Sequence, residues 1–181
     1  MMPEISLNIL DVAENSVRAE ASLIEIYVEE NTATDTLTVI ISDNGRGMDA
    51  QTVAGVTDPF YTTRATRRVG LGLPFYRMAA ELTGGDLRIT SKPGEGTVVT
   101  AAFGLSHIDR MPLGDINGTV ATLIHCNPEI DFIYCHTVDG RVMRLDTKEF
   151  RDVLGDIPLN TPEVAAFINE YLKENSKGLY I

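Results

Sequence analysis

Tryptophan is absent from this sequence of 181 residues, cysteine occurs only twice, and no long uninterrupted apolar run is present. A membrane-spanning helix needs about 20 consecutive apolar residues, so the sequence predicts no membrane association. Residues 1–4 lack the basic start and the apolar stretch of a signal peptide, which favours a cytoplasmic protein. Neither Cys126 nor Cys135 has metal-ligand partners at the usual spacing. Because no secretion signal is expected, both are interpreted as buried thiols in a reducing compartment.

Basic residues are also scarce, since 15 Lys and Arg stand against 26 Asp and Glu, for a formal net charge of −11. This charge argues against a nucleic-acid partner, because affinity for duplex DNA depends on a basic face. Two common phosphate-binding motifs are missing as well. The sequence contains no G-x-x-x-x-G-K-[ST] loop, and Gly70-Leu71-Gly72 lacks the third glycine and the preceding strand of a dinucleotide-binding fingerprint.

Apolar spacing in the first part of the chain alternates between helical and strand-like periods. The predicted elements are a helix over residues 5–19, strands over 23–30 and 36–42, a helix from 72 to the glycine pair at 84–85, and strands over 86–91 and 97–103. This order predicts an α+β fold, a two-layer sandwich with helices on one face of a mixed sheet. We place a domain boundary at residue 104, where the glycine-containing motifs end.

Residues 105–181 are predicted to form a small C-terminal extension that packs on residues 1–104. Its expected elements are a helix over 116–124, a hairpin with strands at 132–138 and 141–145, and helices that begin near 147 and at 161. The hairpin is indicated by Asp139-Gly140, a strong turn signal between two strand-like runs. Because an isolated hairpin is barely stable, the extension needs a packing partner.

Four further motifs occur along the first part in an informative order. They are LDVAENS at 10–16, DNGRGM at 43–48, DPFYTTR at 58–64 followed by VGLGL at 69–73, and GEGT at 94–97. Together they resemble the N, G1, F and G2 boxes of the histidine-kinase-like ATP-binding domain of the GHKL superfamily (Bergerat fold), which includes gyrase, heat-shock ATPase chaperones and mismatch-repair ATPases. The resemblance covers about residues 5–104 and implies a mixed, mainly antiparallel sheet that binds ATP with Mg²⁺.

The resemblance assigns roles to two residues of the first helix. Asn15 offers a hard oxygen ligand to Mg²⁺ that phosphates already hold. Asp11 lies one turn earlier and matches the carboxylate that orients or deprotonates the attacking water, although many relatives carry Glu there, which reaches one methylene further. Glu14 points about 100° away from its neighbour Asn15 around the helix axis, whereas Asp11 shares the face of Asn15, so Asp11 is the catalytic candidate. Without the other motifs, the polar side chains of Asp11 and Asn15 would be interpreted as part of an ordinary exposed helix face.

The second motif implies the adenine site. Asp43 matches the aspartate that accepts a hydrogen bond from the adenine amino group, which discriminates against guanine because guanine presents an oxygen there. An aspartate that only caps a turn is the alternative interpretation. Gly45 and Gly47 let the backbone pass close to the base. Met48 is expected to line the adenine pocket, and Thr97 to reach adenine directly or through water.

Residues 61–69 are expected to form a lid over the phosphates. Three of the 15 basic residues lie in this loop, which suits a triphosphate ligand in an acidic chain, whereas the alternative is a solvated basic loop. Gly70 and Gly72 free backbone amides at a helix start, where the helix dipole favours phosphate oxygens. The expected nucleotide contacts are Asn15 (also the metal ligand), Asp43, Gly45, Gly47, Met48, Phe60, Thr63, Arg64, Arg68, Gly70, Leu71, Gly72, Leu73 and Thr97.

The resemblance favours a stand-alone domain that binds ATP or ADP and transfers phosphate to a partner protein in signal transduction. We expect no phosphoacceptor helix before residue 5, and the near-match to a kinase H box at His107 has Ile108 where an acidic residue is usual. Two alternatives stay open. One is a non-catalytic module whose partner affinity depends on nucleotide, and the other is a slow ATPase switch that uses Asp11 and water.

Overall fold

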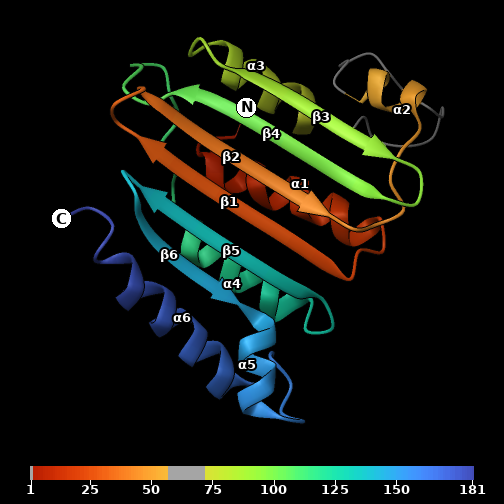
Figure 1. The fold of residues 1–181 in the computed structure, drawn as a ribbon, viewed down its shortest axis with the longest axis vertical. Helices are drawn as coiled ribbons and strands as arrows, with labels where there is room; N and C mark the ends of the chain where they lie inside the picture. Colours follow the sequence, from red (N-terminus) through yellow and green to blue (C-terminus); the bar gives the residue numbers. More distant parts are fainter. Residues whose placement is uncertain (1, 57–71) are drawn as a thin grey trace.

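The computed structural model describes residues 2–56 and 72–181 and contains a six-stranded mixed sheet with helices along one face (Figure 1). The strands are β1 (Leu23–Asn31), β2 (Thr36–Asp43), β3 (Asp86–Lys92), β4 (Gly96–Gly104), β5 (Asp131–Val138) and β6 (Arg141–Asp146). The helices are α1 (Ile5–Arg18), α2 (Ala50–Gly55), α3 (Gly72–Glu81), α4 (Ile116–Cys126), α5 (Thr147–Leu154) and α6 (Pro162–Ser176). The predicted two-layer α+β fold is confirmed, whereas the short helix α2 was not predicted.

The strands follow the order β3-β4-β2-β1-β5-β6. Neighbouring strands run antiparallel except β1 and β5, which pair in parallel from Leu23↔Asp131 to Glu30↔Val138. The hairpin expected in the C-terminal extension therefore continues the sheet of the first 104 residues. The domain boundary at residue 104 stays a prediction, and the sheet runs across it.

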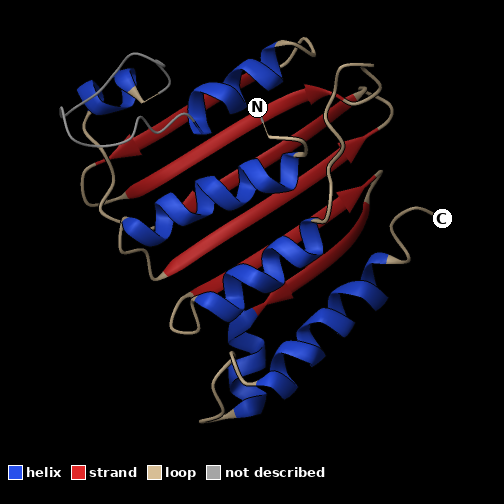
Figure 2. Cartoon of the chain, turned by 180° about the vertical axis from the view of Figure 1, so that it is seen from behind, coloured by secondary structure: helices blue, strands red, loops and turns tan. Residues whose placement is uncertain are grey.

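The core lies between the sheet and the helices α1, α3 and α4, which cover the face seen in Figure 2. On the face seen in Figure 1, none of the described helices lies over the sheet. The buried stripe of α1 follows from side chains three or four positions apart sharing one helix face. Its members are Ile5, Ser6, Asn8, Ile9, Val12, Ala13 and Ser16. Each large apolar side chain buried in this way contributes roughly 1.5–3 kcal/mol.

The C-terminal helix α6 lies beside the edge strand β6 and packs on α4 and β6 (Figure 2). Val164, Ile168 and Leu172 form its buried stripe with a spacing of four residues. Pro162 occupies the first turn, as expected from the sequence. At 15 residues α6 is not long enough to cross a membrane, and none of the other helices in the described ranges could do so.

The two cysteines differ from their interpretation as buried thiols. Cys126 is exposed, because it falls outside the apolar face of α4 at the last residue of that helix. Cys135 is partly buried on the helix-free face of the sheet, because its neighbours Tyr134 and His136 take the core-facing positions of β5. The interpretation is therefore wrong for Cys126 and only partly right for Cys135.

Candidate nucleotide-binding site

Asp43 is the last residue of β2, and two hydrogen bonds fix its side chain. Ser16 Oγ on α1 donates to Asp43 Oδ2 at 2.6 Å, and the amide of Gly45 donates to Oδ1 at 2.9 Å. Ser16 is buried and Asp43 is partly buried, so the first of these bonds is partly shielded from water. Because a carboxylate has about four acceptor positions, Asp43 keeps capacity to accept a hydrogen bond from a ligand.

The loop after Asp43 passes so close to neighbouring backbone that two of its glycines have no room for a side chain. A Cβ on Gly45 would lie 2.7 Å from the carbonyl oxygen of Ala19, and a Cβ on Gly47 would lie 1.9 Å from that of Lys92. Gly47 also has a φ of +67°, a conformation that side chains disfavour. The loop is therefore held between the end of α1 and the turn that joins β3 to β4.

Ser91 on β3 links two of the predicted site residues, Met48 and Thr97. Its Oγ accepts from the amide of Met48 at 2.8 Å, donates to the carbonyl oxygen of Gly96 at 2.8 Å, and lies 2.9 Å from the hydroxyl of Thr97. Thr97 in turn pairs with Asp43 between β4 and β2. The Asp43 carboxylate, the Met48 loop and the Thr97 hydroxyl are thus brought together at one end of the sheet.

Helix α1 places Asp11 and Asn15 one turn apart, beside the start of α3. A Cβ on Gly72 would lie 1.8 Å from Asp11 Oδ2, so the Asp11 carboxylate contacts the first residue of α3. The Asn15 side chain is exposed, and its Oδ1 accepts from Arg18 at 2.9 Å. Because Ser16 follows directly, one helix carries the catalytic candidate, the metal-ligand candidate and the support of Asp43.

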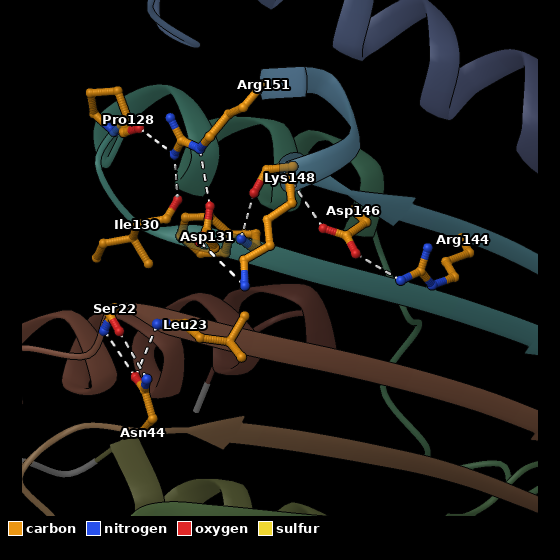
Figure 3. A network of polar contacts seen from close by, with 12 residues as sticks. Ser22, Leu23, Asn44, Pro128, Ile130, Asp131, Arg144, Asp146, Lys148 and Arg151 are labelled. Carbon is orange, nitrogen blue, oxygen red and sulfur yellow. Dashed lines mark hydrogen bonds and ion pairs between the residues drawn. The ribbon is translucent and has the colours of Figure 1, made fainter. Parts of the chain in front are cut away.

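Asn44 anchors the same loop to the start of β1 (Figure 3). Its Oδ1 accepts from the amides of Ser22 at 2.9 Å and Leu23 at 3.0 Å, and its Nδ2 donates to Ser22 Oγ at 2.8 Å. The carbonyl of Ser22 then accepts from the amide of Asp131, the first residue of β5. These bonds tie the end of β2, the start of β1 and the start of β5 into one assembly.

The loop ends where α2 begins. Asp49 caps that helix and accepts from the amide of Thr52 at 2.7 Å, which lowers the pKa of the Asp49 carboxyl. After α2 the chain enters residues 57–71, which lie outside the described ranges. The predicted lid at 61–69 lies there, as do six predicted contacts: Phe60, Thr63, Arg64, Arg68, Gly70 and Leu71. Of the remaining contacts, Leu73 in the first turn of α3 is partly buried against the core.

Two residues of this region, Ser16 and Ser91, were missed by sequence reasoning. A signal existed for Ser16, which falls on the buried stripe of α1, where a hydroxyl needs a hydrogen-bond partner. Ser91 could have been found from the register of the β3–β4 hairpin, which places it opposite Thr97. Both act on predicted residues rather than in place of them.

The comparison with known protein families shows to which family the chain belongs. A model of histidine kinase-, DNA gyrase B- and HSP90-like ATPases matches residues 4–107. The chain belongs to this ATPase family. The matched span holds α1, the Asp43 loop and the β3–β4 hairpin, and so every predicted contact. Domains of this family bind ATP, typically with Mg²⁺.

The chain is similar to bacterial sensor kinases over part of their length. The sensor protein kinase FleS of Pseudomonas aeruginosa is 36% identical over 108 residues, which cover 60% of this chain and 26% of FleS. The signal transduction histidine-protein kinase AtoS of Escherichia coli is 34% identical over 101 residues, 55% of this chain and 16% of AtoS. The chain thus spans 26% or less of the length of these relatives.

Among solved structures, the chain is similar to the N-terminal domain of a DNA repair protein, with a TM-score of 0.56. The match covers 99% of this chain and 57% of the other, at 14% sequence identity. At that identity the likeness shows the fold alone. Since it covers nearly the whole chain, the shared fold includes strands and helices beyond residue 104.

The residues of the site fit an adenine nucleotide with a magnesium ion. Asp43 is oriented by two donors and keeps acceptor capacity, and Gly45 and Gly47 bring backbone close to it. Asn15 offers one hard oxygen at the surface of α1. A single protein oxygen suits Mg²⁺, which keeps several waters and takes other ligands from phosphates.

Proposed function

We propose that the chain binds Mg-ATP and transfers the γ-phosphate to a partner protein in a signalling pathway. The observation that carries the nucleotide site is the Asp43 carboxylate, fixed by Ser16 and Gly45 beside Thr97. The transfer to a protein is supported by the sensor kinases FleS and AtoS among the relatives.

In this proposal each residue of the site has a task that its geometry allows. Asp43 accepts a hydrogen bond from the adenine amino group, and the Thr97 hydroxyl approaches the base from the neighbouring strand. Asn15 holds Mg²⁺, which neutralises charge on the phosphate oxygens. The start of α3 presents backbone amides at the positive end of a helix dipole, which favours phosphate oxygens at that place.

The transfer itself requires an acceptor hydroxyl or imidazole that the partner supplies. Phosphoryl transfer depends mainly on positioning and on electrostatic stabilisation of the equatorial oxygens, so the chain needs to provide a rigid frame more than a strong base. The hydrogen bonds of Ser16, Ser91 and Asn44 provide such a frame around the loop after Asp43.

The test is transfer of label from γ-labelled ATP to soluble proteins of the source cell. We expect label on a discrete protein with the wild-type chain and none with Asp43→Ala, which loses the adenine contact. Bound ATP without any labelled protein, or label that persists with Asp43→Ala, would contradict the proposal.

A second candidate function, a slow ATPase switch, is favoured by the contact between Asp11 and the first residue of α3. ADP release by the purified chain tests it, with Asp11→Asn as the variant. Glu14→Gln is the matched control, because Glu14 is an exposed carboxylate on the same helix and pairs with Arg18. Turnover that is lost in Asp11→Asn and kept in Glu14→Gln would assign Asp11 as the base and make the chain a self-sufficient ATPase.

A further inference from the structure

Helices α5 and α6 lie beyond the β6 edge of the sheet (Figure 1). Residues of both helices and of the segment between them line an apolar groove. It has a volume of about 380 Å³ and is lined by Leu154, Ile157, Thr161, Glu163, Val164 and Phe167. Ile157 and Phe167 are each 53% exposed, and nearby Val153 is 86% exposed. A cavity of about 150 Å³ holds one benzene ring, so this groove has room for two large apolar side chains.

The walls of the groove are fixed before any ligand arrives. The ring of Phe150 on α5 packs edge to face on Phe167 at 5.8 Å and on Tyr171 at 5.4 Å, which joins α5 to α6. Arg151 anchors α5 to the start of β5 through Asp131 and the carbonyls of Pro128 and Ile130 (Figure 3). A preformed groove costs less ordering entropy on binding than a flexible one.

Glu163 is the charged residue that lines the groove, and together with the carboxylates near the lining residues in the sequence it is here called the rim. Between residues 152 and 172 the sequence contains four carboxylates and no Lys or Arg. The carboxylates are Asp152, Asp156, Glu163 and Glu170, all exposed, and none forms an ion pair with another residue in the described ranges. The two cations of α5, Lys148 and Arg151, are directed to Asp131 instead. Glu163 in the groove lining therefore carries negative charge that no ion pair among the described residues offsets, and the other three carboxylates add to it before the next cation of the sequence, Lys173.

The acidic and apolar groups are arranged in one stripe along α6. Glu163, Phe167 and Glu170 are spaced by four and three residues, so they share a face of the helix. That face lies beside the buried stripe of Val164, Ile168 and Leu172, which packs into the core. An apolar anchor point flanked by carboxylates on both sides is thus available to a partner.

The apolar lining and the acidic rim of the groove together favour one kind of binding partner. The groove offers side chains and no free strand edge, so an extended peptide would leave its backbone amides unpaired, whereas a helix satisfies its own. A second copy of this chain would bring another acidic rim, and an anionic membrane surface would be repelled in the same way. We propose that the α5–α6 groove docks an amphipathic helix with a basic polar face, supplied by a partner protein.

This surface goes beyond the proposed nucleotide site, and its occupation needs no ATP. The titrations are therefore done with the full chain and without nucleotide, so that a failure of docking and a failure of ATP binding are measured separately. Asp43→Ala, which removes the adenine contact, is expected to leave docking unchanged.

The probes are two labelled peptides of about 18 residues, long enough to sample a helix. They share one Leu/Phe face and differ only in the polar face, which is Lys in one and Glu in the other. Fluorescence anisotropy at about 0.15 M salt, where the Debye length is about 8 Å, limits long-range attraction to the acidic chain. We expect saturable binding of the Lys peptide, at least about tenfold tighter than that of the Glu peptide, a difference of about 1.4 kcal/mol.

Two groove variants and two matched controls locate the binding site. Phe167→Ser removes an apolar wall of the groove, and Glu163→Lys reverses a charge of the rim. Each is expected to lower the affinity for the Lys peptide by about tenfold. Ile108→Ser and Asp109→Lys make similar changes, from apolar to polar and from acidic to basic, in an exposed loop that is distant from the groove in the sequence. They are expected to change the affinity for the Lys peptide by less than about twofold. Ile157→Ser repeats the apolar test should Phe167→Ser lower the melting temperature.

Three results would overturn the proposal. The first is no saturable binding of either peptide. The second is equal weakening by the groove variants and the loop controls, which would mean that the Lys peptide is attracted only by the net charge of the chain. The third is binding of the chain to vesicles of phosphatidylcholine and phosphatidylglycerol that Phe167→Ser abolishes, which would make the groove a lipid contact.

Discussion

Single hydroxyl groups hold the candidate nucleotide site in shape. Ser16 orients the Asp43 carboxylate from α1, and Ser91 joins the Met48 amide, the Gly96 carbonyl and the Thr97 hydroxyl from β3. The sequence predicts Asp43, Met48 and Thr97 because family motifs carry them. It does not predict the serines that position them, because those contacts join segments 27 and 43 residues apart.

Replacing Ser91 tests whether this positioning matters for the ligand. Ser91→Ala leaves the Met48 amide and the Gly96 carbonyl without their partner, at a cost of about 1–3 kcal/mol, and we expect ATP affinity to fall by about tenfold. Ser91→Thr keeps the hydroxyl and restores affinity. Thr90→Ala, at the exposed neighbouring position, is the control in the same calorimetric titration. Unchanged ATP affinity in Ser91→Ala would show that the loop holds its shape without Ser91.

Asn15 provides the second prediction at the scale of residues. Its side chain is exposed and bonded only to Arg18 among the described residues, so its replacement leaves the core unchanged. Asn15→Ala is expected to remove most of the increase in ATP affinity that Mg²⁺ gives, and to leave affinity in EDTA unchanged, because only the ion contact is lost. Asn15→Asp keeps an oxygen ligand and serves as the control. Loss of affinity to the same degree with and without Mg²⁺ would contradict the assignment.

At the scale of elements, the parallel pairing of β5 with β1 was the main feature that sequence patterns did not reveal. The hairpin β5–β6 was predicted from its turn signal at residues 139–140, because that signal is local. Which strand it would join depends on packing between segments about 100 residues apart, and periodicity carries no such information. Helices α1, α3, α4, α5 and α6 were recognised for the same reason as the hairpin, from local spacing and caps.

The pairing of β5 with β1 predicts the behaviour of a shortened chain. A fragment of residues 1–104 would leave the outer edge of β1 with unpaired amides and carbonyls and would uncover apolar residues of α1 that meet α4. We expect this fragment to aggregate and to lack a cooperative thermal transition. Sedimentation and circular dichroism beside the full chain measure both properties, and a monomeric fragment that melts cooperatively would show the prediction to be wrong.

A cluster of Glu30, the buried His136 and the exposed Tyr180 joins β1, β5 and the C-terminal segment, and it makes stability depend on pH. The Glu30 carboxylate bonds to His136 at 3.0 Å and to the Tyr180 hydroxyl. The bond to His136 lowers the pKa of Glu30, burial opposes this shift, and the bond to Tyr180 adds to it. A group whose pKa is lowered on folding contributes stability above its ordinary pKa, 4.5 for Glu30, and loses it as the pH falls below that value.

The matching measurement is the free energy of unfolding of Glu30→Gln from pH 7 to pH 3.5. At pH 7 we expect a loss of about 1–3 kcal/mol, because hydrogen bonds to a charged group are replaced by weaker ones. The difference from wild type is expected to shrink as the pH falls below 4.5, where Glu30 gains a proton in the unfolded chain, and to vanish below the lowered pKa of Glu30 in the folded protein. Glu29→Gln, at the exposed neighbouring position, is the control. A difference that stays constant with pH would contradict this account of the cluster.

At the scale of the whole molecule, one fold carries both a candidate nucleotide site and an acidic groove. The candidate site forms beside α1, where β2 ends and β4 begins, and the groove forms beyond the edge strand β6. The candidate site could be proposed from the sequence because its motifs are carried by residues next to each other in the sequence. The groove was not, because it is made by two helices whose mutual packing rests on Phe150, Phe167 and Tyr171.

The central claim, that this chain binds Mg-ATP through Asp43, is tested most directly by calorimetric titration of the full chain and of Asp43→Ala. We predict saturable binding of one Mg-ATP by wild type and by Asp109→Ala, a control in an exposed loop, and no measurable binding by Asp43→Ala. Asp43→Asn serves as a second variant should Asp43→Ala prove unstable, since an amide keeps an acceptor for Ser16 or Gly45 but changes the group that meets adenine. Unchanged Mg-ATP affinity in these Asp43 variants, or no binding by wild type, would contradict the account.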